Sequence, residues 1–224
     1  MYETDAVSLN RSYPAFRRVR SVFARGKNPL MKRILCIGDS NTWGYDPSSY
    51  FGLQYPADVR WTGCLEEAGW LVVNGGQNGL SIPGAVAFPM MREYIRSKLP
   101  VDIISVMLGS NDLLEGATAA EAAKRMEGFL SCVREAAPDT SVLLIAPPVM
   151  KPGTWVQSRL LTEESASLAA EYKELAKRMN IGFVDSGQWG VELTYDGVHF
   201  TSDGHRAFSE GLLRAIGEAT EKRG

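Results

Sequence analysis

Histidine and cysteine are scarce in this chain, and their scarcity limits the chemistry it can perform. Among 224 residues there are two histidines, His199 and His205, and three cysteines. Cys36, Cys64 and Cys132 lie far apart and form no Cys-x-x-Cys pair, so the sequence favours a reducing compartment over a disulfide framework. No pair of ligands has metal spacing, so a zinc site is not predicted. We expect no cofactor.

Long apolar runs and a strong charge of one sign are missing as well. The longest apolar runs are strand-sized, so no membrane-spanning helix is predicted, and a cytoplasmic location is expected. A formal net charge of −2 does not indicate nucleic acid or an anionic membrane as a partner. With 45% hydrophobic residues the chain can form one good-sized core, which favours one domain over two.

Residues 1–30 differ in composition from the rest of the chain. They contain six basic and two acidic side chains but no apolar central stretch, so we do not expect them to form a secretory signal. The patterned sequence begins at Met31. We therefore expect residues 1–30 to form a loosely ordered basic extension and residues 31–224 to form the domain. A short tail packed on the domain is the alternative.

From Met31 onward, strand-sized apolar runs alternate with longer amphipathic stretches. The predicted strands are residues 33–37, 70–73, 102–108, 141–146 and 181–184. The predicted helices lie near residues 58–68, 84–98, 118–136, 162–179 and 202–221. Thr118 and Glu121 have the spacing of a capping box at the start of the third helix. Continuous apolar strands separated by helices indicate an α/β fold, with a parallel sheet covered on both faces.

Polar segments follow these strands. Folds of this kind place their sites beyond the carboxyl ends of the strands. The segments are Asp39-Ser40-Asn41 after the first strand, 74–79 after the second, 109–112 after the third and 147–157 after the fourth. A further loop, 196–199, precedes the last helix. Their shared placement predicts one site at this edge of the sheet.

Ser40, His199 and Asp196 have the chemistry of a nucleophilic site. A serine is a poor nucleophile unless a base takes its proton, and histidine is the usual base at neutral pH. Asp196 stands three residues before His199, close enough to orient the ring. His205 falls within the last predicted helix, where packing or capping is the simpler interpretation. The Gly-Asp-Ser motif alone is weak, because turns favour the same residues.

A site for acyl transfer also needs donors where negative charge develops. The side-chain amide of Asn111 and the backbone N–H groups of Gly79 and Ser40 are candidates. The glycines of residues 75–79 do not form a dinucleotide loop, because Asn74 occupies the first glycine position of Gly-x-Gly-x-x-Gly. The chain also lacks a Walker motif and the Gly-x-Ser-x-Gly elbow of α/β-hydrolases.

In order along the chain, these segments resemble the four blocks of the SGNH (GDSL-type) hydrolases. The matching residues are Gly38-Asp39-Ser40, Gly79, Asn111 within Gly-x-Asn-Asp, and Asp196-x-x-His199. The resemblance extends from about Lys32 to the C-terminus. Gly-Asp-Ser-x-Thr-Trp-Gly at 38–44 and Asp-Val-Arg-Trp-Thr-Gly at 58–63 look like the arylesterase/acyltransferase branch. One departure is Asn41, where the family often has leucine, and it bears on the packing beside Ser40.

The resemblance implies a fold, an activity and a set of roles. The fold is a single three-layer α/β/α domain with a flavodoxin-like sheet of five parallel strands. Ser40 is the implied nucleophile, His199 the base and Asp196 the orienter, with oxyanion donors at Ser40, Gly79 and Asn111. Asp39 and Asp112 match the motifs too, and we interpret them as residues that hold turns.

We therefore expect a cofactor-independent serine ester hydrolase that acts on small-molecule, short-chain (acetyl-type) esters. A carbohydrate O-acetyl esterase or an acyltransferase of the same fold is the alternative, and a non-catalytic carbohydrate-binding module is more remote. Whether the chain forms a homo-oligomer stays open. Bulky side chains near the strand ends are candidates for the substrate walls: Trp43, Trp61 and Trp155, with Tyr45 and Val149. Trp155 is the strongest, because loop 147–157 should lie over the strand ends.

Overall fold

Five parallel strands form one sheet, in the order β2-β1-β3-β4-β5, in the computed structural model, which describes residues 31–49 and 51–221. The strands are β1 (Arg33–Gly38), β2 (Leu71–Gly76), β3 (Ile103–Met107), β4 (Ser141–Ala146) and β5 (Gly182–Asp185). This is the flavodoxin-like order, in which the direction of winding changes between β1 and β3. The predicted fold class is confirmed.

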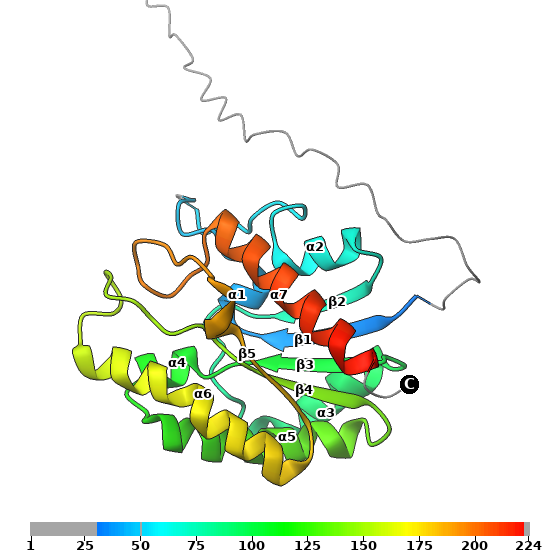
Figure 1. The fold of residues 1–224 in the computed structure, drawn as a ribbon. Helices are drawn as coiled ribbons and strands as arrows, with labels where there is room; N and C mark the ends of the chain where they lie inside the picture. The colour runs from blue at the N-terminus through cyan, green and yellow to red at the C-terminus, as the bar shows by residue number, and fades with distance from the viewer. Residues whose placement is uncertain (1–30, 50, 222–224) are drawn as a thin grey trace, which may run out of the picture. The chain divides into compact units, whose positions relative to one another are not determined.

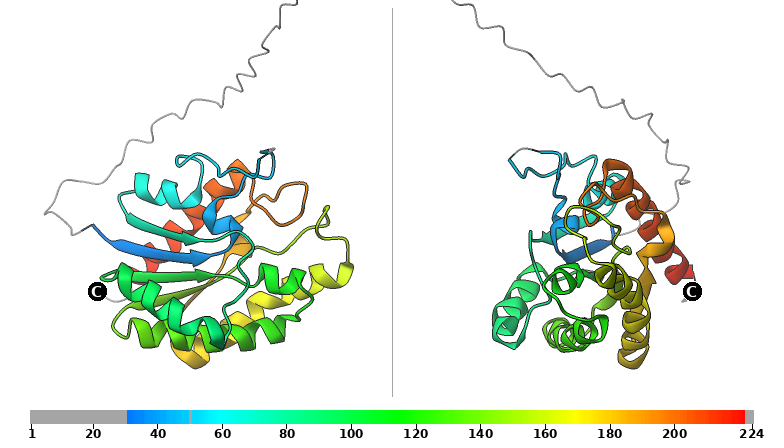
Figure 2. Two further views of the ribbon diagram at one scale, coloured as in Figure 1. Left: turned by 180° about the vertical axis from the view of Figure 1, so that it is seen from behind. Right: turned by 90° about the vertical axis from the view of Figure 1, so that its left-hand side faces the viewer.

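Helices cover both faces of the sheet (Figure 1). One face carries α2 (Trp61–Glu67) and α7 (Ser202–Glu221), and the other carries α3 (Phe88–Lys98), α5 (Ala119–Ala136) and α6 (Arg159–Met179). Figure 2 shows the same two layers from other directions. The predicted extension at residues 1–30 lies outside the described residues. Within the described ranges, no helix combines the length and apolar character that crossing a bilayer requires.

The sheet separates two hydrophobic clusters, and β1 contributes to both. Ile34 and Cys36 face the cluster under α2 and α7, whereas Leu35 and Ile37 face the larger cluster under α3, α5 and α6. Successive residues of a strand point to opposite faces, so a strand that is covered on both sides reads as a continuous apolar run. Burial raises the pKa of the Cys36 thiol to about 12. Cys36 is thus a buried, unreactive side chain.

All the predicted strands and helices occur, but their ends differ by up to four residues: α2 begins at Trp61, α3 at Phe88 and α6 at Arg159. The capping box is confirmed, because the Thr118 hydroxyl accepts from the Glu121 N–H and the Glu121 carboxylate accepts from the Thr118 N–H. Strand β2 continues to Gly76, since residues 74–76 pair with the end of β1. Two short helices, α1 (Ser40–Trp43) and α4 (Ser110–Leu114), occupy segments expected to be turns. Both follow central strands directly, so they bring the polar segments to the sheet edge.

Candidate active site

Ser40 is the first residue of α1, immediately beyond the end of β1. The carboxylate of Asp39 accepts a hydrogen bond from the Asn41 N–H at 2.9 Å and thereby caps this short helix. Helix α4 occupies the same position after β3. The nucleophile candidate therefore lies where the winding of the sheet changes direction, the usual place for a site in this fold.

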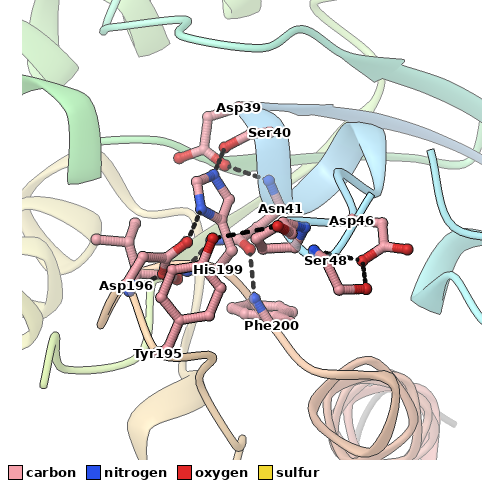
Figure 3. A network of polar contacts seen from close by, with 11 residues as sticks. Asp39, Ser40, Asn41, Asp46, Ser48, Tyr195, Asp196, His199 and Phe200 are labelled. Carbon is pink, nitrogen blue, oxygen red and sulfur yellow. Dashed lines mark hydrogen bonds and ion pairs between the residues drawn. The ribbon is translucent and has the colours of Figure 1, made fainter. Parts of the chain in front are cut away.

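Three side chains form a continuous hydrogen-bonded chain (Figure 3). The Ser40 Oγ lies 2.9 Å from the His199 Nε2, and the His199 Nδ1 lies 2.7 Å from the Asp196 Oδ2. His199 and Asp196 are each 2% exposed, and Ser40 is 7% exposed. The structure thus brings together the serine, histidine and aspartate that the sequence singles out, in the order that a Ser-His-Asp triad needs.

The surroundings of Asp196 decide where the protons lie. Burial alone would raise the pKa of Asp196, but hydrogen bonds from the His199 side chain and from the N–H groups of His199 and Val198 outweigh burial and hold it below its usual range. An ionised carboxylate can only accept hydrogen bonds, so the His199 Nδ1 carries the hydrogen between them. In the neutral ring, Nε2 then faces the Ser40 hydroxyl with a free lone pair. This is the arrangement of a general base.

Two aromatic rings contact the His199 imidazole. The Tyr45 ring lies tilted at 4.7 Å between centroids, and the Trp155 ring lies edge-on at 4.9 Å. Tyr45 is half-buried, whereas the Trp155 side chain is 52% exposed. Two of the predicted wall residues therefore lie directly against the base, and Trp155 also presents surface to solvent.

Loop 147–157 is attached to the loop that carries the histidine. The Trp155 N–H donates to the Asp196 carbonyl at 3.1 Å, and the Lys151 N–H donates to the Gly197 carbonyl at 3.0 Å. Gly197 has φ +86°, and a Cβ there would lie 2.0 Å from the Lys151 carbonyl oxygen. A larger residue would separate the two loops. Both loops lie beyond the strand ends in Figure 1, as predicted for residues 147–157.

Trp61 does not line the site, and its predicted role as a substrate wall is wrong. Its side chain is 1% exposed, packs against Phe208 in the core and donates its indole N–H to the Asn41 carbonyl at 2.9 Å. A side chain with no open surface cannot contact a substrate. Trp43 is half-buried, with its backbone packed against Gly76, and Val149 is half-buried beside Gly187. Their roles as walls stay predictions.

Asn111 and Gly79, the candidate oxyanion donors, are joined through the residue after Gly79. The Asn111 side-chain amide donates one hydrogen to the Leu80 carbonyl at 3.0 Å, and a primary amide carries a second. Asp112, beside Asn111, is fully buried, accepts from the Ile82 N–H and pairs with Arg125 at 2.9 Å. The predicted turn-holding role of Asp112 is thereby confirmed, and the same contacts support the segment that carries Gly79.

Asp39 is buried beside the nucleophile and also holds a turn. Burial raises the pKa of Asp39 to about 6, and the hydrogen bond from the Asn41 N–H offsets only part of that rise. No sequence pattern assigns a role to Asn41 itself. Its side chain nevertheless bonds to the backbone of Val198 and Phe200, on either side of His199. The only sign of this role in the sequence is that Asn41 stands where the family often has leucine.

His205 is a core residue, as its place in the last helix predicts. It is fully buried, and its ring packs edge-on against Tyr55 and Phe200. Its Nδ1 accepts from the backbone N–H of Trp61 at 3.4 Å. Burial, followed by the nearby charge of Arg60, lowers the pKa of His205 to about 3. The second histidine is therefore neutral and structural.

Comparison with known proteins agrees with this geometry. Residues 36–207 match the family model described as the GDSL-like lipase/acylhydrolase family. The chain belongs to this family. Membership makes it a carboxylic ester hydrolase, and the hydrogen-bonded serine, histidine and aspartate fit the triad of such an enzyme. No curated protein matches the sequence.

Several solved structures have the same fold. A carbohydrate acetylesterase from Sinorhizobium meliloti is 26% identical, with a TM-score of 0.74 over 84% of this chain and 99% of that chain. The aryl esterase of M. smegmatis is 29% identical, with a TM-score of 0.73 over 84% and 99% of the two chains. A putative arylesterase from Agrobacterium tumefaciens is 26% identical at the same TM-score, 0.73, and the same coverage, 84% and 99%. The similarity to the arylesterase branch is thus confirmed.

The lowered pKa of His205 predicts a loss of stability in acid. The unfolded chain takes up a proton on this ring below about pH 6.5, whereas the folded chain resists protonation down to about pH 3. The stability that His205 contributes is therefore fully present above pH 6.5 and declines as the pH falls toward 3. We expect His205→Asn, which keeps an acceptor for the backbone N–H of Trp61, to lower the melting temperature at pH 7. The melting temperature of this variant should also fall less steeply between pH 7 and 4 than that of the wild type.

Circular dichroism melts of both proteins at each pH measure this slope. Asp39, whose raised pKa acts with the opposite sign, is present in both proteins and cancels in the comparison. Parallel melting-temperature profiles for the two proteins would show that His205 titrates normally in the fold.

Proposed function

We propose that the protein hydrolyses short-chain acyl esters with Ser40 as nucleophile, His199 as base and Asp196 as the group that orients the base. The observation that carries this proposal is the chain of contacts at 2.9 and 2.7 Å from the serine through the histidine to the aspartate. All three side chains are buried, so their hydrogen bonds compete with little water. A non-catalytic binding module has no need of such a chain.

In the proposed reaction, the Ser40 Oγ attacks the ester carbonyl while the His199 Nε2 takes its proton. The Ser40 and Gly79 N–H groups and the Asn111 amide donate to the oxyanion of the tetrahedral intermediate. Collapse of the intermediate expels the alcohol, which receives the proton from His199 and leaves an acyl group on Ser40. Water, activated by the same histidine, then releases the acid. An alcohol in place of this water would make the reaction an acyl transfer, and that alternative stays open.

Two observations support small acyl esters as the substrates. Tyr45 and Trp155 contact His199 directly, so bulky rings stand close to the place where the ester must lie. Structures with 26–29% identity are named as aryl esterases and as a carbohydrate acetylesterase. Acetylated carbohydrates are therefore a second substrate class within the same proposal. Trp155, half-exposed beside the base, is the proposed contact for the substrate.

Substitution of the two reacting residues tests the proposal. Ser40→Ala should lower kcat for 4-nitrophenyl acetate by several orders of magnitude, and His199→Ala by on the order of 10³-fold or more, while both variants stay folded. His205→Asn is the matched control and should lose far less activity, because this ring lies in the core. Mass spectrometry should detect a fluorophosphonate adduct on Ser40 of the wild type. Near-normal turnover by Ser40→Ala would overturn the proposal.

The oxyanion assignment has a kinetic signature of its own. Asn111→Ala should lower kcat by about 10²- to 10³-fold with little change in KM, because the donor acts mainly on charge that develops in the transition state. Steady-state kinetics on an aryl acetate separate the two constants. A large rise in KM with unchanged kcat would instead make Asn111 a residue that binds the substrate in its ground state.

Acyl length is the third measurable property. Each buried methylene contributes about 0.8 kcal/mol, but a chain that extends past the aromatic rings leaves its methylenes in water. We expect acetyl and butyryl esters to be turned over best, and kcat/KM to fall steeply beyond about eight acyl carbons. A series of 4-nitrophenyl esters from acetyl to dodecanoyl checks this. A maximum at dodecanoyl would indicate a long acyl channel.

A further inference from the structure

We infer that Asn41 is a positioning residue, which holds the backbone on both sides of His199 and thereby sets the base against Ser40. The inference rests on the proposed function, because it takes His199 to be the base. The Asn41 Nδ2 donates to the Val198 carbonyl at 3.1 Å, and its Oδ1 accepts from the Phe200 N–H at 3.0 Å. Figure 3 shows this side chain between Ser40 and the histidine segment, residues 198–200.

The two partners are the residues directly before and after His199. A carbonyl only accepts and an N–H only donates, so the pair of contacts also fixes which way the planar amide faces. One amide that holds two points of a short segment restrains both its distance and its rotation. Because Asn41 follows Ser40 in α1, the nucleophile and the support of its base belong to adjacent residues of one helix turn.

Asn41 is itself held in place from the core. Its N–H donates to the Asp39 carboxylate at 2.9 Å, and its carbonyl accepts the Trp61 indole N–H at 2.9 Å. The Asn41 side chain is 3% exposed and Trp61 is 1% exposed. The contacts therefore lead without a gap from helix α2, through Trp61 and Asn41, to the segment that carries the histidine. Trp61 thus acts on the site from behind rather than as a wall.

The histidine segment has an internal support as well, and the two supports act differently. The Asp196 carboxylate accepts from the N–H groups of Val198 and His199, both within its own loop. Those bonds shape the loop but do not place it against β1. The Asn41 bonds connect the loop to α1, at the end of β1, and so act on the 2.9 Å gap between the Ser40 Oγ and the His199 Nε2. A leucine at position 41 could fill the space but could form neither bond.

The test compares Asn41→Leu with a matched loss of another amide near α1. Asn74 donates to the Thr42 carbonyl and the Thr62 hydroxyl and does not touch the histidine segment, so Asn74→Leu is the control. With 4-nitrophenyl acetate, Asn41→Leu should lower kcat by about 10- to 100-fold with KM within about twofold, since a small misplacement of reacting groups has effects of this order. Asn74→Leu should change kcat by less than about threefold, even if both variants melt at a similarly lowered temperature.

A double-mutant cycle shows whether Asn41 acts through His199. In the His199→Ala background, Asn41→Leu should leave the residual rate unchanged within about twofold, because the group it positions is already gone. The rate of Ser40 labelling by a fluorophosphonate should fall in parallel with kcat in the single variant. If leucine prevents folding, Asn41→Ala removes the same two bonds without the bulk and carries the same expectation.

The outcomes separate this inference from the proposed function. If Asn41→Leu keeps wild-type kcat, changes only KM, or lowers the rate equally with and without His199, Asn41 does not position the base. If Ser40→Ala and His199→Ala keep their activity, the proposed function fails first. Large losses of kcat for Ser40→Ala and His199→Ala, with no loss for Asn41→Leu, would contradict only the inference about Asn41.

Discussion

The site depends on an ionised, buried aspartate. Asp196 is 2% exposed, and a carboxylate in that position is stable only when several donors surround it. The backbone N–H groups of Val198 and His199 supply two, and the His199 ring supplies the third. Because the charge needs the ring hydrogen at Nδ1, the other ring nitrogen is left free for Ser40. One requirement of electrostatics thus determines the tautomer of the base.

The loops around this carboxylate pack closely against each other. The tight turn after Asp196 uses Gly197 with φ +86°, and loop 147–157 approaches it so closely that Gly153 has no room for a Cβ beside the Asp196 backbone. These contacts place Trp155 against the imidazole. The aromatic contact to the base is therefore a consequence of how the loops satisfy each other's backbone groups. The contact between Trp155 and the imidazole does not need a hydrophobic cluster of its own to hold it.

The parts of the molecule that could be predicted are those with a local physical signal. The strands were recognisable because a sheet covered on both faces needs apolar residues on both sides, as Ile34 and Leu35 in β1 show. The grouping of Ser40, Asp196 and His199 in one site could be predicted from their side-chain chemistry and from their order along the chain. Helices α1 and α4 carry no such signal, because four or five residues are too few to show a helical period.

Side-chain direction was harder to foresee than the elements themselves. Trp61 and Trp155 look alike in a sequence, but one is buried under α7 and the other stands half-exposed over the base. The sequence placed Trp155 in a loop over the strand ends and Trp61 in a predicted helix, but it did not report which way the Trp61 side chain points. The role of Asn41 was hidden for a related reason, since its partners lie 157 and 159 residues further along the chain.

His199 and His205 show how far the surroundings decide the use of one side chain. His205 is enclosed by Tyr55 and Phe200 with a backbone N–H as its partner, so burial keeps it neutral and inert. His199 is as deeply buried but has a carboxylate on one nitrogen and a hydroxyl on the other. Burial removes competing water from both rings, but only the His199 ring has a group to orient it and a proton to accept. The polar partners, rather than exposure to solvent, distinguish the reactive histidine from the structural one.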